Sequence, residues 1–428
     1  MMAGDSNLGL RKVITVRHAV AIYISSVLGA GILVIPGLAA RTAGPASLLA
    51  WVLLSLASYP FAYTFATLSA HRPDSGGIYS FARESFGSRV GTMTGWLFVS
   101  WVVTGAPAIT LAAGSYIAFS FPMPKIDVFV AAACIIYVAY SVNFLGIKLS
   151  GKVQVAVVTM IVLLLVSGVV ASAPRLAISH FTPFLPSGVA SIGVASALIV
   201  WSYLGYENVS NIAEEFENPR RDFGRSVTFS VLLIGALYLA VAFTIVGTGA
   251  YSAGGGVTPF AELLTNAFGT YGGALVSILA VVIIFGTVNA YTAGMARVVY
   301  AAARDGAFPR FLAKVDPKTG VPRRALLALL ALITVSLLLY YYLQLDVQTG
   351  FLVTSGSAIL TYLIGSLAGV RLLKEKGARR ALPWLSLLAS IALIPFIGVQ
   401  LIPSLVSAGL GLGYGWLKNR PSTSGSTN

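Results

Sequence analysis

Two interrupted apolar stretches of this chain carry the residue types that could bind a charged small molecule. The first reads SVLGAGILVIP and holds Gly29 and Gly31, one residue apart. The second reads SALIVWSYLGY and is followed at once by Glu207, a carboxylate deep within an apolar segment. At a helix break, free amides attract an anion and freed carbonyls attract a cation. A zwitterion with both charges on one carbon fits such a pair of breaks.

The glycine pair by itself has a simpler explanation, because glycine also lets membrane helices pack closely. The second break, at Leu204-Gly205-Tyr206, and the adjacent Glu207 favour a binding site instead. Two interrupted segments in corresponding positions are typical of a transporter site near the middle of the membrane.

The elements that must position these residues are membrane-spanning helices. Only 10% of the 428 residues are charged and 57% are apolar, whereas soluble proteins average about 25% charged. Many apolar segments approach or exceed the roughly 18 residues that mark a transmembrane helix. The sequence therefore predicts an all-α integral membrane protein with about twelve spans and a short extramembrane helix at 257–268. The predicted spans are 17–40, 47–69, 90–119, 127–145, 153–173, 188–213, 226–249, 272–302, 323–343, 349–370, 382–401 and 403–417.

The two interrupted segments are the first and the sixth span, which divides the chain into two halves of five helices. Because five is odd, the halves would have opposite topology, as inverted repeats require. We therefore expect five parts. They are a cytoplasmic N-terminal segment (1–16), a first repeat (17–173), a second repeat (188–370), helices 11 and 12 (382–417) and a disordered cytoplasmic tail (418–428).

The distribution of basic residues predicts the orientation in the membrane. All but three of the 28 Lys and Arg residues fall on the side that carries both termini; the exceptions are Arg41, Lys125 and Arg175. Cytoplasmic loops carry an excess of Lys and Arg, so both termini are expected in the cytoplasm. The net charge of +14 then reflects this bias and not a nucleic-acid surface.

Several other classes of protein and site are excluded or disfavoured. The single Cys134 permits no intramolecular disulfide and no cysteine metal site, and the three histidines are scattered, so we expect no metal and no cofactor. No cleavable signal peptide is evident. An enzyme would need a buried nucleophile and base, and a channel would need a polar stripe or a ring of charge. The spans offer neither.

Four stretches of the sequence, in order, resemble the amino acid–polyamine–organocation permeases: GAGILVIP, RPDSGGIYSFARESFG, WSYLGYENVSNIAEEFENPRRDFGRSV and NAYTAGMARVVYAAARDGAFPRFL. Within that superfamily, GWLFVSWVVTGAPA and LGYENVSNIAEEFENPRRDF are most similar to the bacterial L-methionine and branched-chain amino acid exporters. The resemblance implies a LeuT-type 5+5 inverted repeat with broken helices 1 and 6 and two extra C-terminal helices.

The resemblance also implies a binding site. Backbone amides of the first break would take the substrate carboxylate, and carbonyls of both breaks would hold the α-ammonium group. The amides belong to Gly29, Ala30, Gly31 and Ile32, and the carbonyls to Val27, Trp201 and Leu204. The Trp201 ring and Tyr291 match aromatic gate positions. We expect position 31 to require glycine, because the Cβ of any other residue would fill the space that the substrate carboxylate needs.

The side-chain pocket is expected to be neutral. Away from the ends of the spans there is no second carboxylate, and no Lys or Arg apart from Arg297 near a cytoplasmic end. Unpaired charges in a membrane are costly, so a charged substrate side chain would lack a partner. The resemblance implies that Ala106, Ile109 and Tyr206 shape the pocket. Methionine, leucine, isoleucine and valine are the substrates that follow.

Glu207 allows two readings. It could take up and release a proton during transport, or it could brace the unwound turn by accepting hydrogen bonds. The fifth-helix lysine of proton-coupled uptake members is replaced by Ile161. The sequence therefore predicts a plasma (inner) membrane transporter, proton-linked, working as an exporter or exchanger. An uptake permease for amino acids or small amines is the alternative, because alternating access is reversible. The partners are an amino acid, protons and lipid, in a monomer or homodimer.

Overall fold

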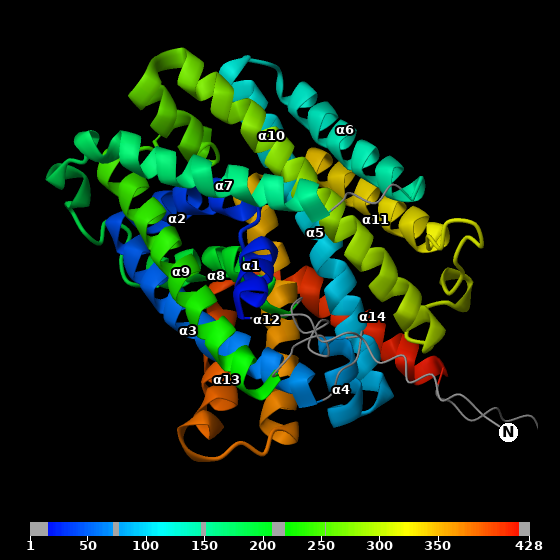
Figure 1. The fold of residues 1–428 in the computed structure, drawn as a ribbon. Helices are drawn as coiled ribbons and strands as arrows, with labels where there is room; N and C mark the ends of the chain where they lie inside the picture. The colour runs from blue at the N-terminus through cyan, green and yellow to red at the C-terminus, as the bar shows by residue number, and fades with distance from the viewer. Residues whose placement is uncertain (1–15, 72–76, 147–150, 208–218, 253, 419–428) are drawn as a thin grey trace, which may run out of the picture.

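The computed structural model describes residues 16–71, 77–146, 151–207, 219–252 and 254–418. All regular structure in these ranges is helical, as predicted (Figure 1). The N-terminal segment and the tail that were predicted as cytoplasmic lie almost wholly outside the described residues.

The described residues of the first half form seven α-helices, with short 3₁₀ helices between some of them. They are α1 Val16–Val27, η1 Ala30–Leu33, α2 Ile35–Ala43, η2 Gly44–Ala46, α3 Ser47–His71, α4 Ile78–Phe86, α5 Ser88–Ser120, α6 Lys125–Phe144, α7 Gly151–Ser172, η3 Ala173–Arg175 and η4 Ile178–Phe181.

The second half repeats this pattern of long helices and short 3₁₀ segments. Its elements are α8 Ala190–Ile199, η5 Val200–Tyr203, α9 Pro219–Thr248, η7 Gly254–Gly256, α10 Pro259–Arg304, η8 Arg310–Leu312, α11 Arg323–Tyr342, α12 Val347–Leu372, η9 Gly377–Arg380, α13 Ala381–Leu393, η10 Ile394–Phe396, η11 Gly398–Leu401 and α14 Ile402–Lys418.

Within the described residues, nine helical stretches are long and apolar enough to cross a membrane, against the twelve predicted spans. The difference has a local cause. The first predicted span is divided into α1, η1 and α2, and the sixth is divided after α8 and η5. The last predicted span forms α14, which has 17 residues. The chain is therefore a multi-pass membrane protein.

The short helix predicted at 257–268 forms the beginning of α10. Gly269 interrupts α10 with a positive φ (φ 70°, ψ −165°), so Pro259 to Phe268 is set apart from the long stretch that follows. Glycine adopts such a conformation at little steric cost.

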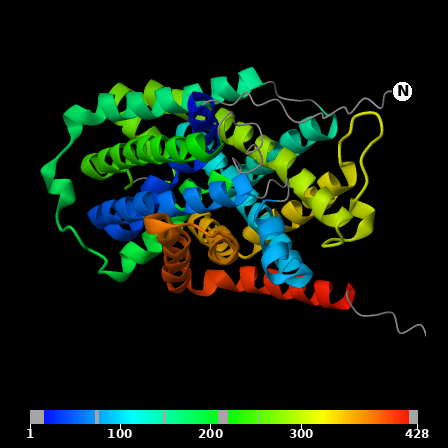
Figure 2. The same cartoon turned by 60° about the horizontal axis from the view of Figure 1, so that its bottom comes forward.

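Helices α5 and α12 form the centre of the bundle. Helix α5 packs against α12, α10, α14, α6 and α4, whereas α3 packs against α9, α8 and α13. The view in Figure 2 places α7 along one edge of the molecule and α14 along the opposite edge. The broken segments η1 and η5 contact each other.

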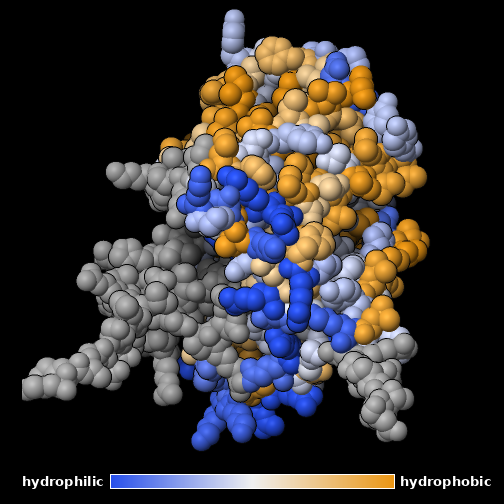
Figure 3. Space-filling view, turned by 90° about the vertical axis from the view of Figure 1, so that its right-hand side faces the viewer, coloured by the Kyte–Doolittle hydropathy of each residue, from blue (hydrophilic) through white to orange (hydrophobic). Residues whose placement is uncertain are grey.

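The surface of the described residues is divided by polarity. Large apolar side chains lie exposed on the outer helices, for example Leu56 of α3, Leu163 of α7 and Leu232 of α9. On the face shown in Figure 3, apolar residues dominate the upper part and hydrophilic residues gather lower down. Exposed apolar surface of this kind is expected where helices face lipid.

Candidate functional site

The first helix break lies at the glycine pair. Helix α1 ends at Val27, Gly29 is extended (φ −99°, ψ −173°), and η1 begins at Ala30. The Gly29 amide donates to the Val27 carbonyl at 2.8 Å. The Ala30 amide donates to Thr287 Oγ1 of α10 at 3.3 Å. The helical hydrogen bonding is thus interrupted where the sequence predicted it, and α10 supplies a replacement partner.

The second break lies after η5 and touches the first. Leu204 is extended, and Gly205 has a φ of +124°. A Cβ on Gly205 would lie 2.2 Å from the backbone oxygen of Ser26 and 2.7 Å from its carbonyl carbon. Only glycine permits this approach. The two interrupted segments therefore meet backbone to backbone.

Glu207 is held at this contact. It is 6% exposed, and its Oε2 accepts a hydrogen bond from the Gly205 amide at 2.9 Å and another from the Tyr362 hydroxyl at 2.5 Å. Its Oε1 is buried without a hydrogen-bond partner among the described residues. This is the geometry expected of a carboxylate that braces the turn, and it leaves one oxygen free to carry a proton.

The Trp201 indole fills a slot between two glycines. A Cβ on Gly31 would lie 2.4 Å from ring atom Cδ1, and a Cβ on Gly105 would lie 2.6 Å from ring atom Cη2. The ring also packs edge-on against Phe351, with 4.9 Å between centroids and 75° between planes. In this conformation the indole lies where a Cβ on Gly31 would stand, and the predicted role of Gly31, to leave space for a substrate carboxylate, stays a prediction.

The predicted side-chain pocket is only partly assembled. Ala106 and Ile109 are buried in α5, next to the Gly105 slot. Tyr206 lies elsewhere, against Tyr23 of α1 with 6.0 Å between ring centroids. The side chain that reaches α5 is that of Trp201, whose ring lies against Gly105.

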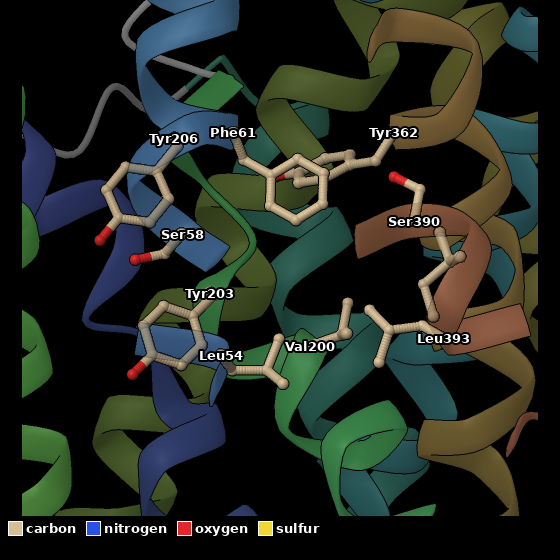
Figure 4. A pocket seen from close by; sticks show the side chains of 10 residues that line it. Leu54, Ser58, Phe61, Val200, Tyr203, Tyr206, Tyr362, Ser390 and Leu393 are labelled. Carbon is tan, nitrogen blue, oxygen red and sulfur yellow. The ribbon is translucent and has the colours of Figure 1, made fainter. Parts of the chain in front are cut away.

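Tyr206 lines a small internal cavity of about 20 Å³ between α3, η5, α12 and α13, enough for about one water. Figure 4 shows Tyr206 and Ser58 on one side of this cavity and Ser390 on the other. Tyr362, the donor to Glu207, also lines it.

Three functional candidates escaped the sequence reasoning: Tyr238, Thr287 and Tyr362. The Tyr238 hydroxyl lies 3.0 Å from the carbonyl oxygens of both Val27 and Ser202. Thr287 stands one helical turn before the predicted gate residue Tyr291, which is half-buried. A polar side chain within each apolar span was the available signal, but the sequence does not say which way it faces.

The remaining predicted site residues lie around the breaks. Ile32 of η1 and Leu204 are buried, and the Trp201 carbonyl accepts the Leu204 amide at 3.3 Å. The described residues contain no group of three or more His, Cys, Asp or Glu side chains that could hold a metal ion.

Comparisons with known proteins match nearly the whole chain. Residues 14–418 match the family model described as amino acid permease. The chain is 33% identical over 408 residues to the uncharacterized amino acid permease YecA of Bacillus subtilis (strain 168), covering 95% of this chain and 96% of the relative.

Two further relatives carry substrate names. The L-methionine/branched-chain amino acid exporter YjeH of Escherichia coli (strain K12) is 28% identical, covering 94% of this chain and 96% of the relative. The branched-chain amino acid permease BcaP of Bacillus subtilis (strain 168) is 29% identical, covering 70% of this chain and 68% of the relative. With its two touching helix breaks and this full-length match, the chain belongs to the amino acid permease family of the amino acid–polyamine–organocation superfamily.

Proposed function

We propose that this permease moves neutral apolar L-amino acids (methionine, leucine, isoleucine and valine) across the plasma membrane by alternating access. The observation that carries the proposal is the contact of Gly205 with the Ser26 backbone, which joins two helix breaks at one place. Backbone amides and carbonyls that leave a helix together can bind both charges of an α-amino acid.

The architecture proposed is the LeuT-type 5+5 inverted repeat, with repeats at 17–173 and 188–370 and two further helices at 382–417. The breaks after α1 and after α8 support this division, because each lies in the first span of one proposed repeat. The basic residues support an orientation with both termini in the cytoplasm.

In the proposed site, amides from Gly29 to Ile32 receive the substrate carboxylate. The Trp201 indole lies beside Gly31 in the conformation described, so carboxylate binding requires the indole to leave its slot. This gives Trp201 the behaviour of a gate. Tyr291, on the same helix as Thr287, is the second proposed gate residue.

The proposed substrate class rests on charge. Glu207 is the carboxylate at the breaks, and Gly205 and Tyr362 already occupy its Oε2. A substrate with a charged side chain would have to bury that charge without a partner beside Ala106 and Ile109. The names of YjeH and BcaP, which refer to methionine and branched-chain amino acids, are consistent with a neutral pocket.

For direction and coupling, we propose export or exchange linked to protons through Glu207. The second candidate is uptake of amino acids or small amines; the name of YjeH refers to an exporter, whereas the name of BcaP gives no direction. The two candidates share one site, because gradients decide the direction of a reversible transporter.

Counterflow in liposomes tests the substrate class. Vesicles that hold the purified protein and unlabelled methionine should accumulate labelled methionine, and leucine, isoleucine and valine should compete. Arginine and glutamate should not compete, because an unpaired buried charge costs several kcal/mol. Effective competition by arginine would contradict the neutral pocket. Repeating the assay with and without a pH gradient tests the coupling.

A further inference from the structure

One hydroxyl group links the two broken helices. Tyr238 lies in α9 and is fully buried, and its hydroxyl oxygen lies 3.0 Å from the carbonyl oxygens of both Val27 and Ser202, which share its single O–H proton. Val27 ends α1 and Ser202 lies in η5, so both carbonyls belong to interrupted segments.

The Tyr238 ring is fixed by its neighbours. It packs edge-on against Trp51 at 5.5 Å between centroids and against Tyr203 at 5.3 Å. The hydroxyl group is therefore held at the two carbonyls by aromatic packing.

The Val27 carbonyl has no spare capacity in this conformation. It accepts the Gly29 amide at 2.8 Å in addition to the Tyr238 hydroxyl. A carbonyl oxygen has two lone pairs; here one accepts the Gly29 amide and the other faces the hydroxyl proton that Val27 shares with Ser202. In the proposed function, this same oxygen receives the substrate ammonium group. An incoming N–H donor must then displace one of the present donors.

We infer that Tyr238 is a positioning residue that competes with the substrate ammonium group for the Val27 carbonyl. This inference rests on the proposed function. When the ammonium group binds, the Tyr238 hydroxyl withdraws from Val27 and keeps Ser202 as its acceptor. Substrate binding thereby releases the hydrogen-bonded link between the two broken helices. The amine of the substrate, and not its side chain, operates this release.

A comparison of two ligands in two proteins isolates the competition. We expect Tyr238→Phe to bind methionine about 2- to 12-fold more tightly than the wild type, the range that one hydrogen bond supports. The variant should bind 4-(methylsulfanyl)butanoate, which has the same carboxylate and side chain but no amine, as weakly as the wild type does. Equilibrium binding to the purified proteins measures both affinities.

Tyr203→Phe is the matched control. Tyr203 contacts the same aromatic cluster, but its hydroxyl pairs with Ser55 Oγ at 2.5 Å and not with a carbonyl of either break. We expect this variant to leave methionine affinity unchanged. If removal of a hydroxyl group acted only by loosening the aromatic cluster, Tyr238→Phe and Tyr203→Phe would change the affinities for methionine and for the desamino acid to the same extent.

A second variant keeps the hydroxyl group. Replacement of Tyr238 by 3-fluorotyrosine makes the phenol a stronger donor, so methionine should bind more weakly while the desamino acid is unaffected. Unchanged or weakened methionine binding in Tyr238→Phe, or equal effects on both ligands in either variant, would overturn the inference. If the wild type binds no amino acid, the proposed function fails and the inference fails with it.

Discussion

At the scale of single residues, Glu207 presents two different oxygens. Its Oε2 is committed to the Gly205 amide and the Tyr362 hydroxyl, whereas Oε1 is buried without a described partner. The proposed proton role is therefore compatible with bracing, because Oε2 accepts the two hydrogen bonds and Oε1 would carry the proton.

Glu207→Gln separates the proton from the brace. Glutamine keeps one acceptor oxygen for Gly205 and Tyr362 but cannot change its charge. We expect methionine exchange to persist, while pH-driven accumulation disappears. Transport by the purified variant in liposomes, over a series of pH values from mildly acidic to mildly alkaline, measures both.

Tyr362→Phe is the control for this prediction. It removes one hydrogen bond to Oε2 and leaves the carboxylate able to titrate, so the response to pH should remain. If Glu207→Gln transports with the same pH profile as the wild type, Glu207 is a brace only. A hydrogen bond to a charged group is worth about 1.5–3 kcal/mol, so a pure brace should still weaken binding when altered.

At the scale of elements, the two breaks depend on each other. Gly205 sits directly on the backbone of Ser26, and Tyr238 connects Val27 to Ser202. The two broken helices are therefore joined by a close backbone contact and by one shared side chain.

Gly205→Ala tests this dependence. The substitution places a Cβ where φ is +124° and only 2.2 Å from the Ser26 oxygen. We expect it to destabilise the folded protein by about 2–5 kcal/mol, the sum of left-handed backbone strain and overpacking. Thermal unfolding in detergent measures the loss, and methionine binding should fall with it.

Gly377→Ala provides the matched comparison for backbone strain alone. Its φ is +62° and a Cβ there would meet nothing within 4 Å. We expect a loss of about 1–2 kcal/mol, from the conformation only. Equal losses in the two variants would show that the breaks are not in tight contact in solution.

At the scale of the whole molecule, exposed apolar residues and basic residues are distributed unevenly. Exposed apolar side chains cover the outer helices, and the Lys and Arg residues are predicted to lie mainly on one side. This asymmetry predicts the orientation in the membrane.

Cysteine labelling tests that orientation. In a Cys134→Ser background the chain has no other cysteine, so a single new thiol reports one site. We expect Gly377→Cys to react with an impermeant maleimide only in inside-out vesicles, and Gly188→Cys to react in intact cells. The reverse pattern would place both termini outside.

The sequence by itself determined the class of this protein and the location of its breaks. Apolar composition requires helices, because a backbone in lipid must satisfy its own hydrogen bonds. The pair Gly29 and Gly31, the Leu204-Gly205-Tyr206 turn and the adjacent Glu207 marked the interrupted positions, since helix breaks depend on local residue types.

Only the tertiary structure decided which side chains meet at those breaks. Three contacts join residues that are far apart in the chain. The Trp201 ring lies between Gly31 and Gly105, and Tyr206 lines a cavity beside α3. The hydroxyl groups of Tyr238 and Tyr362 bind groups at the two breaks. In helices that are apolar on every face, hydrophobic periodicity does not reveal which face is buried. The direction in which these side chains point is therefore determined by packing between helices, and not by a local sequence pattern.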